Sequence, residues 1–261
     1  MDGDSLQRSG AEFEALRDEA HVWLLRLDEH AAPGILALHR SVLDPRELAR
    51  HRRYLRDESR DTFAIAHGAL RRTLSHYADV APQEWSFAIG EHGRPEIDAP
   101  APLRDLRFNL SHTRGLVAFV VTAGIDCGID VEATGHAKDP LRLAERVFAA
   151  SELEDLRAQP PGNVRARFHE YWTLKEAYIK ARGLGLALPL RDFAFEIGAA
   201  SAVAIRFGAS IDDDPSRWQF ECRRPTPQHQ LALALGRPGG GNGRPIPVRV
   251  RTVALPATRG G

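Results

Sequence analysis

Lysine is scarce in this sequence of 261 residues. Of its 35 basic residues only Lys138, Lys175 and Lys180 are lysines, so arginine supplies almost every positive charge. Two of these three lysines stand in the stretch WTLKEAYIK, where they flank Glu176. A chain that otherwise avoids ammonium groups places two of them beside one carboxylate, which indicates a chemical role for this stretch.

Cysteine is also sparse, and long apolar runs are missing. The sequence has only Cys127 and Cys222, and no run reaches the roughly 18 apolar residues that a membrane-spanning helix needs. We therefore expect a reduced, cytoplasmic protein with free thiols and no membrane partner. The formal net charge is +0, so no overall field favours nucleic acid as a partner. The 11 histidines lack the spacing of a zinc site.

The hydrophobic pattern predicts an α+β protein built from two similar halves. With 43% hydrophobic residues the chain can bury one large core or two smaller ones, and each half has the pattern of helices followed by strands. We expect a flexible N-terminus over residues 1–18, one α+β half over residues 19–124 and a second over residues 125–261. The apolar stretches LVAFVVTA and CGIDVEA are predicted to form a hairpin around Gly124.

Two helix starts carry capping signals. Asp44 as N-cap, Pro45 as the first helical residue and Glu47 as the third predict a helix in DPRELARHRRYLR. Ser151 and Glu154 fit the same pattern and predict a helix in SELEDL. Both signals place charged residues near helix ends.

Two acids lie in a stretch that is otherwise apolar. Asp130 and Glu132 stand two residues apart in GIDVE, so on a strand their side chains project from one face while Val131 turns the other way. Burying two like charges is costly unless a basic group or a hard cation such as Mg²⁺ balances them. An exposed edge is the ordinary explanation of a D-x-E pattern, but the flanking residues FVVTAGIDCGI are too apolar for it.

A helix predicted over residues 164–182, with Gly183 as its left-handed cap, brings a third carboxylate. Glu176 falls opposite the apolar face of this helix, and Lys180 is its i+4 neighbour. A stabilising surface pair is the simple alternative, but it leaves Trp172 and Ile179 on the same side unexplained. Glu176 could complete a metal site with the two strand acids, while a lysine beside it could contact phosphate as a point charge.

Polar and basic residues in the first half are candidates for anion binding. His112 follows Ser111 at the end of LRFNLSHT, where side chains and backbone N–H groups could hold a phosphate. Arg50 lies on a basic helix face, and Arg94 lies in the turn GEHGRPEI. A single histidine or arginine of this kind is more often a packed or solvated side chain. Only the combination of these residues favours an anion-binding site.

Three stretches in chain order, FNLSHT, GIDVE and WTLKEAYIKARGLGL, resemble the three signatures of 4′-phosphopantetheinyl transferases. The resemblance spans about residues 43–190, and the length is similar to that of the monomeric, surfactin-synthetase-activating class. It implies two α+β halves related by a pseudo-twofold axis, with coenzyme A and Mg²⁺ bound in the cleft between them. It also implies that the protein acts as a monomer.

The implied reaction is Mg²⁺-dependent transfer of 4′-phosphopantetheine from coenzyme A to a serine of an apo acyl or peptidyl carrier protein, with release of adenosine 3′,5′-bisphosphate. The resemblance assigns metal binding to Asp130, Glu132 and Glu176. It makes Glu176 the candidate base and Lys180 a catalytic phosphate contact. The residues that it implies for coenzyme A binding are Arg50, Arg94, Ser111, His112, Lys175 and Lys180.

Two points stay open in this comparison. Glu47 is acidic where some relatives carry lysine, which puts the N-terminal phosphate contacts in doubt but not the reaction. Lys175 completes the motif without a defined role. The alternative function is a noncatalytic module that binds coenzyme A or a carrier protein with the same fold.

Overall fold

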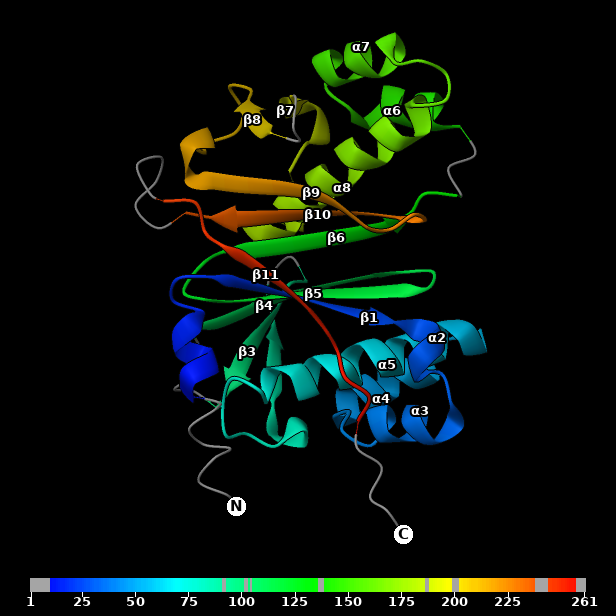
Figure 1. Cartoon of the computed structure of the whole chain (residues 1–261), viewed down its shortest axis with the longest axis vertical. Helices are drawn as coiled ribbons and strands as arrows, with labels where there is room; N and C mark the ends of the chain where they lie inside the picture. The colour runs from blue at the N-terminus through cyan, green and yellow to red at the C-terminus, as the bar shows by residue number, and fades with distance from the viewer. Residues whose placement is uncertain are drawn as a thin grey trace. The chain divides into compact units, whose positions relative to one another are not determined.

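The computed structural model is a mixed α+β structure, which confirms the predicted fold class, and it divides into two compact units. Unit 1 comprises Met1–Ile89, Pro95–Gly124 and Pro247–Gly261, and unit 2 comprises Gly90–Arg94 and Ile125–Ile246. In both units of Figure 1, helices pack against a β-sheet. The structure describes residues 10–90, 93–100, 103, 105–135, 139–185, 188–198, 202–237 and 244–256.

The main sheet of unit 1 has the strand order β11-β1-β5-β4. Its strands are β1 (Ala20–Arg26), β4 (Leu106–Thr113), β5 (Leu116–Ala123) and β11 (Val248–Thr252). β1 pairs parallel with β11, while β5 pairs antiparallel with both β1 and β4. The continuous apolar run of β5 is buried over nearly its whole length, as a central strand covered on both faces requires. A separate antiparallel ribbon joins β2 (Ser86–Ile89) and β3 (Pro95–Ala99).

The helices of unit 1 are α2 (Leu27–His30), α3 (Pro33–Arg40), α4 (Pro45–Arg52), α5 (Asp57–Leu74) and the short η1 (Pro82–Glu84). The predicted capping box of α4 is confirmed. The backbone N–H of Glu47 donates to Asp44 Oδ1 at 2.8 Å, and the backbone N–H of Asp44 donates to Glu47 Oε2 at 3.1 Å. The long helix α5 buries an apolar face from Phe63 to Leu74, which forms much of the core of unit 1.

Unit 2 repeats this plan with a three-stranded antiparallel sheet, a two-stranded ribbon and one long helix. The sheet contains β6 (Cys127–Ala133), β10 (His229–Gly236) and β9 (Trp218–Thr226), in that order, and the ribbon contains β7 (Phe193–Ile197) and β8 (Val203–Phe207). The helical segments are α6 (Pro140–Val147), α7 (Ala150–Ala158), α8 (Val164–Arg182), η4 (Leu190–Asp192) and η6 (Pro215–Arg217). Leu174, Ala177 and Tyr178 of α8 are fully buried in the core of this unit.

Gly128 lets α8 lie directly on β6. A Cβ atom added at Gly128 would meet the carbonyl oxygen of Ala177 at 2.1 Å and the backbone nitrogen of Ala181 at 2.5 Å. Because both atoms belong to the backbone of α8, no side-chain movement can relieve the clash. The glycine therefore sets the distance between the strand and the helix that carry the predicted site residues.

Gly128→Ala should lower the free energy of unfolding by about 3 kcal/mol or more, since the whole helix has to move away from β6. Urea unfolding followed by circular dichroism measures this change. Gly34→Ala in α3 is the control, because nothing lies within 4 Å of its added Cβ. Alanine should leave stability there unchanged or raise it by up to about 1 kcal/mol. Equal stability of Gly128→Ala and the unchanged protein would contradict the close packing of β6 and α8.

The division of the chain differs from the predicted one at both ends. The boundary falls between Gly124 and Ile125 as expected, but β11 pairs with β1, and the C-terminal segment therefore belongs to unit 1. Residues 10–15 are helical and Leu16 is buried, so the predicted flexible terminus does not extend over them. Residues 1–9 of that prediction lie outside the described residues.

Two local predictions are wrong. β5 and β6 do not form a hairpin, because β5 pairs with β1 and β4 while β6 pairs with β10. The turn at Gly124 was correct, with a φ of 66°, but each strand completes a different sheet. Helix α7 begins at Ala150, and its N-terminus is capped by Glu152 instead of Ser151 and Glu154. The Glu152 carboxylate accepts a hydrogen bond from the backbone N–H of Ala149 at 2.9 Å.

The composition also led to expectations about membrane helices and about the two cysteines. Among the described residues no helix is long and apolar enough to cross a membrane. Cys127 is buried, Cys222 is half-buried, and both are free thiols. Burial raises the pKa of the Cys222 thiol to about 12, so this group stays protonated and unreactive at neutral pH.

Candidate active site

Strand β6 carries two of the predicted acids on one face. Asp130 lies opposite Ala232 of β10, and Glu132 lies opposite Gln230. Asp130 is only 5% exposed, and Val131 between the acids is buried on the other face. The alternative of a solvated edge is therefore wrong for Asp130, since its carboxylate is held inside the protein.

Helix α8 places Lys180 on this carboxylate. The Lys180 ammonium donates to Asp130 Oδ1 at 2.6 Å and to the carbonyl oxygen of Ile129 at 3.2 Å. The Lys180 side chain keeps 26% of its surface exposed, so its amine reaches solvent as well as the buried acid. A charge-assisted hydrogen bond of this length is among the stronger contacts available to a lysine.

Glu176 lies one turn before Lys180 on α8, and the charges of both Asp130 and Lys180 affect the pKa of its carboxyl. Burial raises the pKa of the Glu176 carboxyl, the neighbouring Asp130 raises it further, and Lys180 opposes the rise. The helix and the strand thus bring together two carboxylates and one ammonium, with a local excess of negative charge. The tight packing at Gly128 makes this approach possible.

The complete metal site is not assembled here. In the described part of the chain, no group of three or more His, Cys, Asp or Glu side chains is arranged to hold a metal ion. The donor chemistry nevertheless suits Mg²⁺, which prefers carboxylate oxygens. Burial and the charge of Asp130 both raise the pKa of Glu176, and a divalent cation would offset the repulsion between the two carboxylates.

Lys175 is enclosed by the protein, and its ammonium contacts protein oxygens. Its side chain is 1% exposed, and its ammonium lies 2.8 Å from Oε2 of Glu152, which is fully buried. The ammonium also donates to the carbonyl oxygens of Leu190 and Phe193, both at 2.7 Å, and Glu152 Oε1 accepts from the backbone N–H of Phe195 at 2.9 Å. This enclosure does not support the expected contact of Lys175 with coenzyme A.

Glu152 is the partner that sequence reasoning missed. It lies in the first turn of α7, and it ties α7 to α8 through Lys175 and to β7 through the backbone N–H of Phe195. Burial raises the pKa of Glu152 and lowers the pKa of Lys175, while the opposite charge of each partner counters these shifts. An acid in a helical first turn gives no sequence signal of a buried pair, because acids are common there as caps.

Arg94 also belongs to unit 2, although it stands in a turn between two strands of unit 1. Its guanidinium donates from Nη1 to the carbonyl oxygen of Ala181 at 2.8 Å. That carbonyl lies in the last turn of α8, where the helix dipole favours a cation. The helix then ends at Gly183, which has a φ of 65° and serves as the predicted left-handed cap. Arg94 therefore contacts the end of the helix that carries Glu176 and Lys180.

The other predicted site residues lie in unit 1. Ser111 is buried and His112 is exposed, and they pair with Ala118 and Val117 across the β4–β5 ladder. Successive residues of a strand face opposite sides of the sheet. Ser111 and His112 therefore do not present their side chains to the same face of β4.

Arg50 lines an apolar pocket of about 180 Å³ in unit 1. Its guanidinium carbon lies 5.2 Å from the centre of the Phe63 ring, a distance at which a cation is attracted to the aromatic face. The pocket extends between α4, α5 and the strands β2 and β4. The side chains that line it also include Arg46, Glu47, His67, Leu70, Phe87, Phe108 and Leu110.

Glu47 holds this part of unit 1 together. Its carboxylate accepts from Arg71 Nε at 2.7 Å and lies 2.9 Å from His67 Nδ1. Arg71 is fully buried and also donates to Asp44 Oδ2 at 2.9 Å. The acid that departs from the family pattern therefore ties α4 to α5. A fully buried arginine in the last turn of α5 was not foreseen from the sequence.

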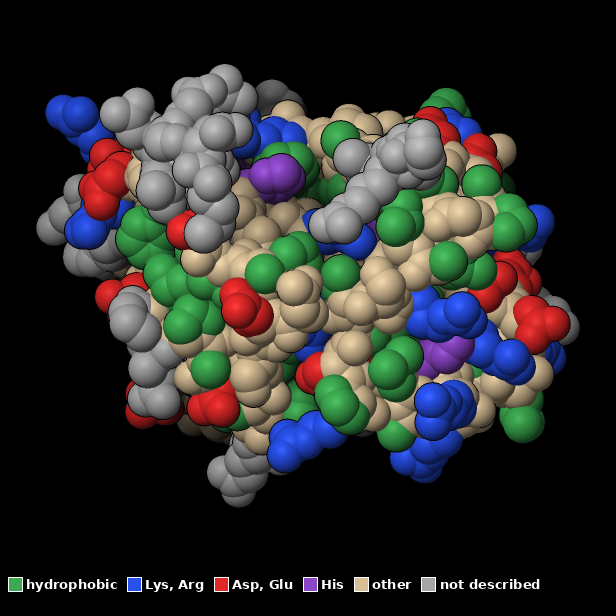
Figure 2. Space-filling view, turned by 90° about the horizontal axis from the view of Figure 1, so that it is seen from below, with side chains coloured by type: hydrophobic (Ala, Val, Ile, Leu, Met, Phe, Trp, Pro, Cys, Tyr) green, Lys and Arg blue, Asp and Glu red, His purple; other side chains and the backbone are tan. Residues whose placement is uncertain are grey.

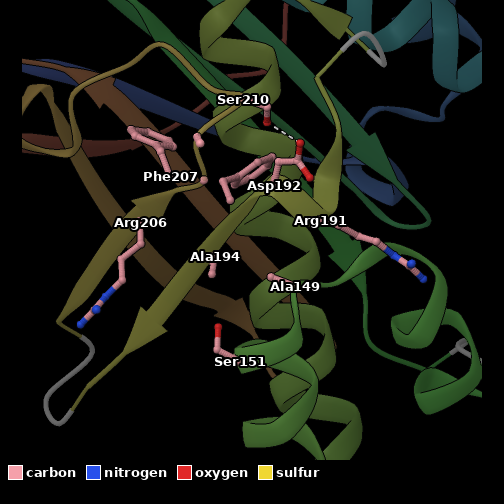
Figure 3. A pocket seen from close by; sticks show the side chains of 11 residues that line it. Ala149, Ser151, Arg191, Asp192, Ala194, Arg206, Phe207 and Ser210 are labelled. Atoms are coloured by element: carbon pink, nitrogen blue, oxygen red, sulfur yellow. Dashed lines mark hydrogen bonds between the residues drawn. The ribbon is translucent and has the colours of Figure 1, made fainter.

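A larger, open hollow of about 520 Å³ in unit 2 contains none of the predicted site residues (Figure 3). Ser210 donates a hydrogen bond to the Asp192 carboxylate, and Arg206 pairs with Glu196 at 2.6 Å. Arg191 and Arg206 extend away from each other in the close-up, and Arg191 donates to backbone carbonyl oxygens of α6. Its polar side chains are thus engaged with the protein itself.

Known proteins match the part of the chain that contains β6 and α8. A model of the 4′-phosphopantetheinyl transferase superfamily matches residues 126–235, a range that contains Asp130, Glu132, Lys175, Glu176 and Lys180. The 4′-phosphopantetheinyl transferase HetI of Nostoc sp. is 36% identical over 172 residues, which cover 66% of this chain and 72% of that protein. The 4′-phosphopantetheinyl transferase Sfp of Bacillus subtilis (strain 168) is 26% identical over 198 residues, covering 76% of this chain and 84% of Sfp.

A solved structure is similar to part of the chain. It is a holo-(acyl-carrier-protein) synthase from Bacillus anthracis str. Ames in complex with CoA (3′,5′-ADP). The similarity covers 42% of this chain and 94% of that chain, at 15% sequence identity and a TM-score of 0.35.

Proposed function

The chain belongs to the 4′-phosphopantetheinyl transferase superfamily, and on that basis we propose that it transfers the 4′-phosphopantetheine group of coenzyme A to a serine of an apo acyl or peptidyl carrier protein. The serine oxygen forms a bond to the β-phosphorus of the diphosphate, the bond to the departing phosphate breaks, and adenosine 3′,5′-bisphosphate leaves. The observation that supports this most is the meeting of Asp130, Glu176 and Lys180 where β6 packs on α8.

We propose Mg²⁺ as the cofactor, held by Asp130, Glu132 and Glu176. When bound, it would stabilise the negative charge on the diphosphate oxygens. The acids of this chain would position it, and Glu176, whose surroundings raise its pKa, would accept the proton of the serine hydroxyl directly or through water. A base with a raised pKa binds that proton more tightly than an ordinary carboxylate.

Lys180 is proposed to contact a phosphate group and to assist the leaving group. Its ammonium lies 2.6 Å from Asp130 Oδ1 and balances the charge of that carboxylate. A cation bound by Asp130 would take over this role, and the long, partly exposed side chain would then be available for a phosphate oxygen.

Coenzyme A is proposed to contact Arg50, Arg94, Ser111 and His112 in addition to Lys180. Arg50 lines the apolar pocket of unit 1, and Arg94 holds the end of α8. Lys175 is proposed as a positioning residue, because its ammonium is enclosed by protein oxygens. We further propose that the chain acts as a monomer. We also propose that it lies in the cytoplasm, a reducing compartment in which two free thiols are expected.

Transfer can be tested with a fluorescent coenzyme A analogue, a panel of apo carrier proteins and a titration of Mg²⁺. The proposal predicts a labelled carrier band that depends on the metal and disappears with a chelator. A noncatalytic module would bind the analogue without labelling any carrier. If the protein is folded and binds the analogue but labels no carrier in the panel, the transferase assignment is wrong.

Lys180→Arg should reduce kcat about tenfold to a hundredfold, because a planar guanidinium keeps the charge but misplaces it relative to the phosphate. Lys180→Met should reduce kcat further, since it removes the charge. Steady-state kinetics with saturating carrier protein measures both changes. Full turnover by Lys180→Arg would show that any cation suffices at this position.

A further inference from the structure

A pocket in unit 1 that the proposed reaction does not use is lined mainly by cationic groups. It measures about 380 Å³ and is formed by Arg40 of α3, by Leu48, His51 and Arg52 of α4, and by Arg60 of α5. Figure 2 shows basic side chains gathered around a histidine on one face of the molecule. Three helices thus contribute basic side chains to one hollow.

This hollow is separate from the apolar pocket that contains Arg50. Arg46 and Arg50 project toward the apolar pocket, whereas His51 and Arg52 project toward the basic one. With 3.6 residues per turn, these two pairs emerge from well-separated sides of α4. The basic pocket is therefore not an extension of the proposed coenzyme A contacts.

The charges of the basic pocket are poorly satisfied by the protein. Within the described ranges, no hydrogen bond or ion pair engages the side chains of Arg40 or Arg52. Arg60 uses one nitrogen, Nη2, for the carbonyl oxygen of Tyr54 at 3.3 Å and for the exposed carboxylate of Asp57 at 3.2 Å. Its Nε is buried and has no hydrogen-bond partner. A buried donor without a partner is costly unless a ligand accepts from it.

The potential inside the pocket is positive. His51 is 8% exposed, and burial lowers the pKa of its imidazole. Arg40, Arg60 and Arg52 lower this pKa further, and Asp61 acts in the opposite direction. Burial and the surrounding cations therefore disfavour the protonated form of the ring.

Helix termini explain part of this pattern but not all of it. Arg40, His51 and Arg52 lie in the last turns of α3 and α4, where the helix dipole stabilises cations. Arg60 lies about one turn from the N-terminus of α5, where the dipole disfavours a cation. The dipoles therefore do not explain why Arg60 joins the other three in one hollow.

We propose that this pocket binds a small, multiply charged phosphate anion such as pyrophosphate or a phosphate ester. Guanidinium groups match phosphate oxygens with paired N–H donors, and three of them converge here. A concave pocket of this volume suits a small ligand. An acidic protein surface would instead need a broad, flat contact area.

Isothermal titration calorimetry of the full chain with inorganic pyrophosphate tests this proposal. The titrations use a chelator and a constant ionic strength, so that neither metal binding nor screening changes between variants. We expect saturable binding, with Kd raised about tenfold or more by Arg52→Gln, because a charge-assisted hydrogen bond is lost. Arg53→Gln is the matched control, since it removes an exposed charge next in the chain but outside the pocket.

The control should change Kd by no more than about twofold. Arg52→Gln should keep the transfer activity of the unchanged protein, so this test stays independent of the proposed reaction. Equal losses in Arg52→Gln and Arg53→Gln would show diffuse attraction and overturn the proposal. Loss of binding only in Arg50→Gln would assign the anion to the other pocket and also overturn it. Binding of an acidic peptide without binding of pyrophosphate would also overturn the proposal.

Discussion

Glu176→Gln is expected to lower kcat for phosphopantetheine transfer about 10²–10⁴-fold while leaving the fold intact. The amide keeps the size of the side chain but cannot accept a proton, and it is a poorer ligand for a hard cation. Because burial and Asp130 already disfavour the charged form of Glu176, the neutral amide should not reduce the free energy of unfolding. Steady-state kinetics and urea unfolding measure the two quantities.

Glu170→Gln is the matched control for this substitution. Glu170 lies on the same helix, and burial also raises the pKa of its carboxyl, but it is not among the predicted site residues. The control should retain kcat within about twofold. Equal losses of kcat in the two variants would mean that the helix as a whole is disturbed, and the role given to Glu176 would be wrong.

Lys175→Met should lower the free energy of unfolding by about 3–5 kcal/mol, because removing one partner of a buried ion pair leaves the other uncompensated. Glu152 would remain fully buried, and the carbonyl oxygens of Leu190 and Phe193 would lose their donor. Urea unfolding of the whole chain, followed by tryptophan fluorescence and circular dichroism, measures the change. The affinity of the folded protein for coenzyme A should stay close to that of the unchanged protein.

A double-mutant cycle separates the pair from other effects. Lys175→Met combined with Glu152→Leu should be more stable than the sum of the single changes predicts, since neither charge is then left alone. Additive losses would contradict a direct interaction between these two residues. A large rise in the Kd for coenzyme A with unchanged stability would instead restore the ligand contact that the sequence suggested for Lys175.

The long, regular elements could be predicted because their patterns are local. The capping box of Asp44 and Glu47 and the left-handed cap at Gly183 appear in the structure where the sequence placed them. The apolar stretches at β5 and β6 are indeed strands, but their pairing depends on partners far along the chain. Strand pairing and the membership of β11 in unit 1 are set by tertiary packing, which local patterns do not encode.

The same limit applies to the candidate site. Same-face placement of Asp130 and Glu132 follows from strand geometry, and Lys180 follows from helical spacing. The contact of Lys180 with Asp130 at 2.6 Å requires the glycine that brings α8 onto β6, and its role was not foreseen. Glu152 was missed because a buried ion pair joins residues that are distant in sequence. Lys175 could then be recognised as structural only from its surroundings.

The most direct test of the transferase assignment is mass spectrometry of an apo carrier protein after incubation with this protein, coenzyme A and Mg²⁺. We predict one added phosphopantetheine group on one serine, an equal amount of adenosine 3′,5′-bisphosphate, and no addition to a carrier whose serine is replaced by alanine. A folded protein that binds coenzyme A but leaves every carrier at its original mass would contradict the assignment.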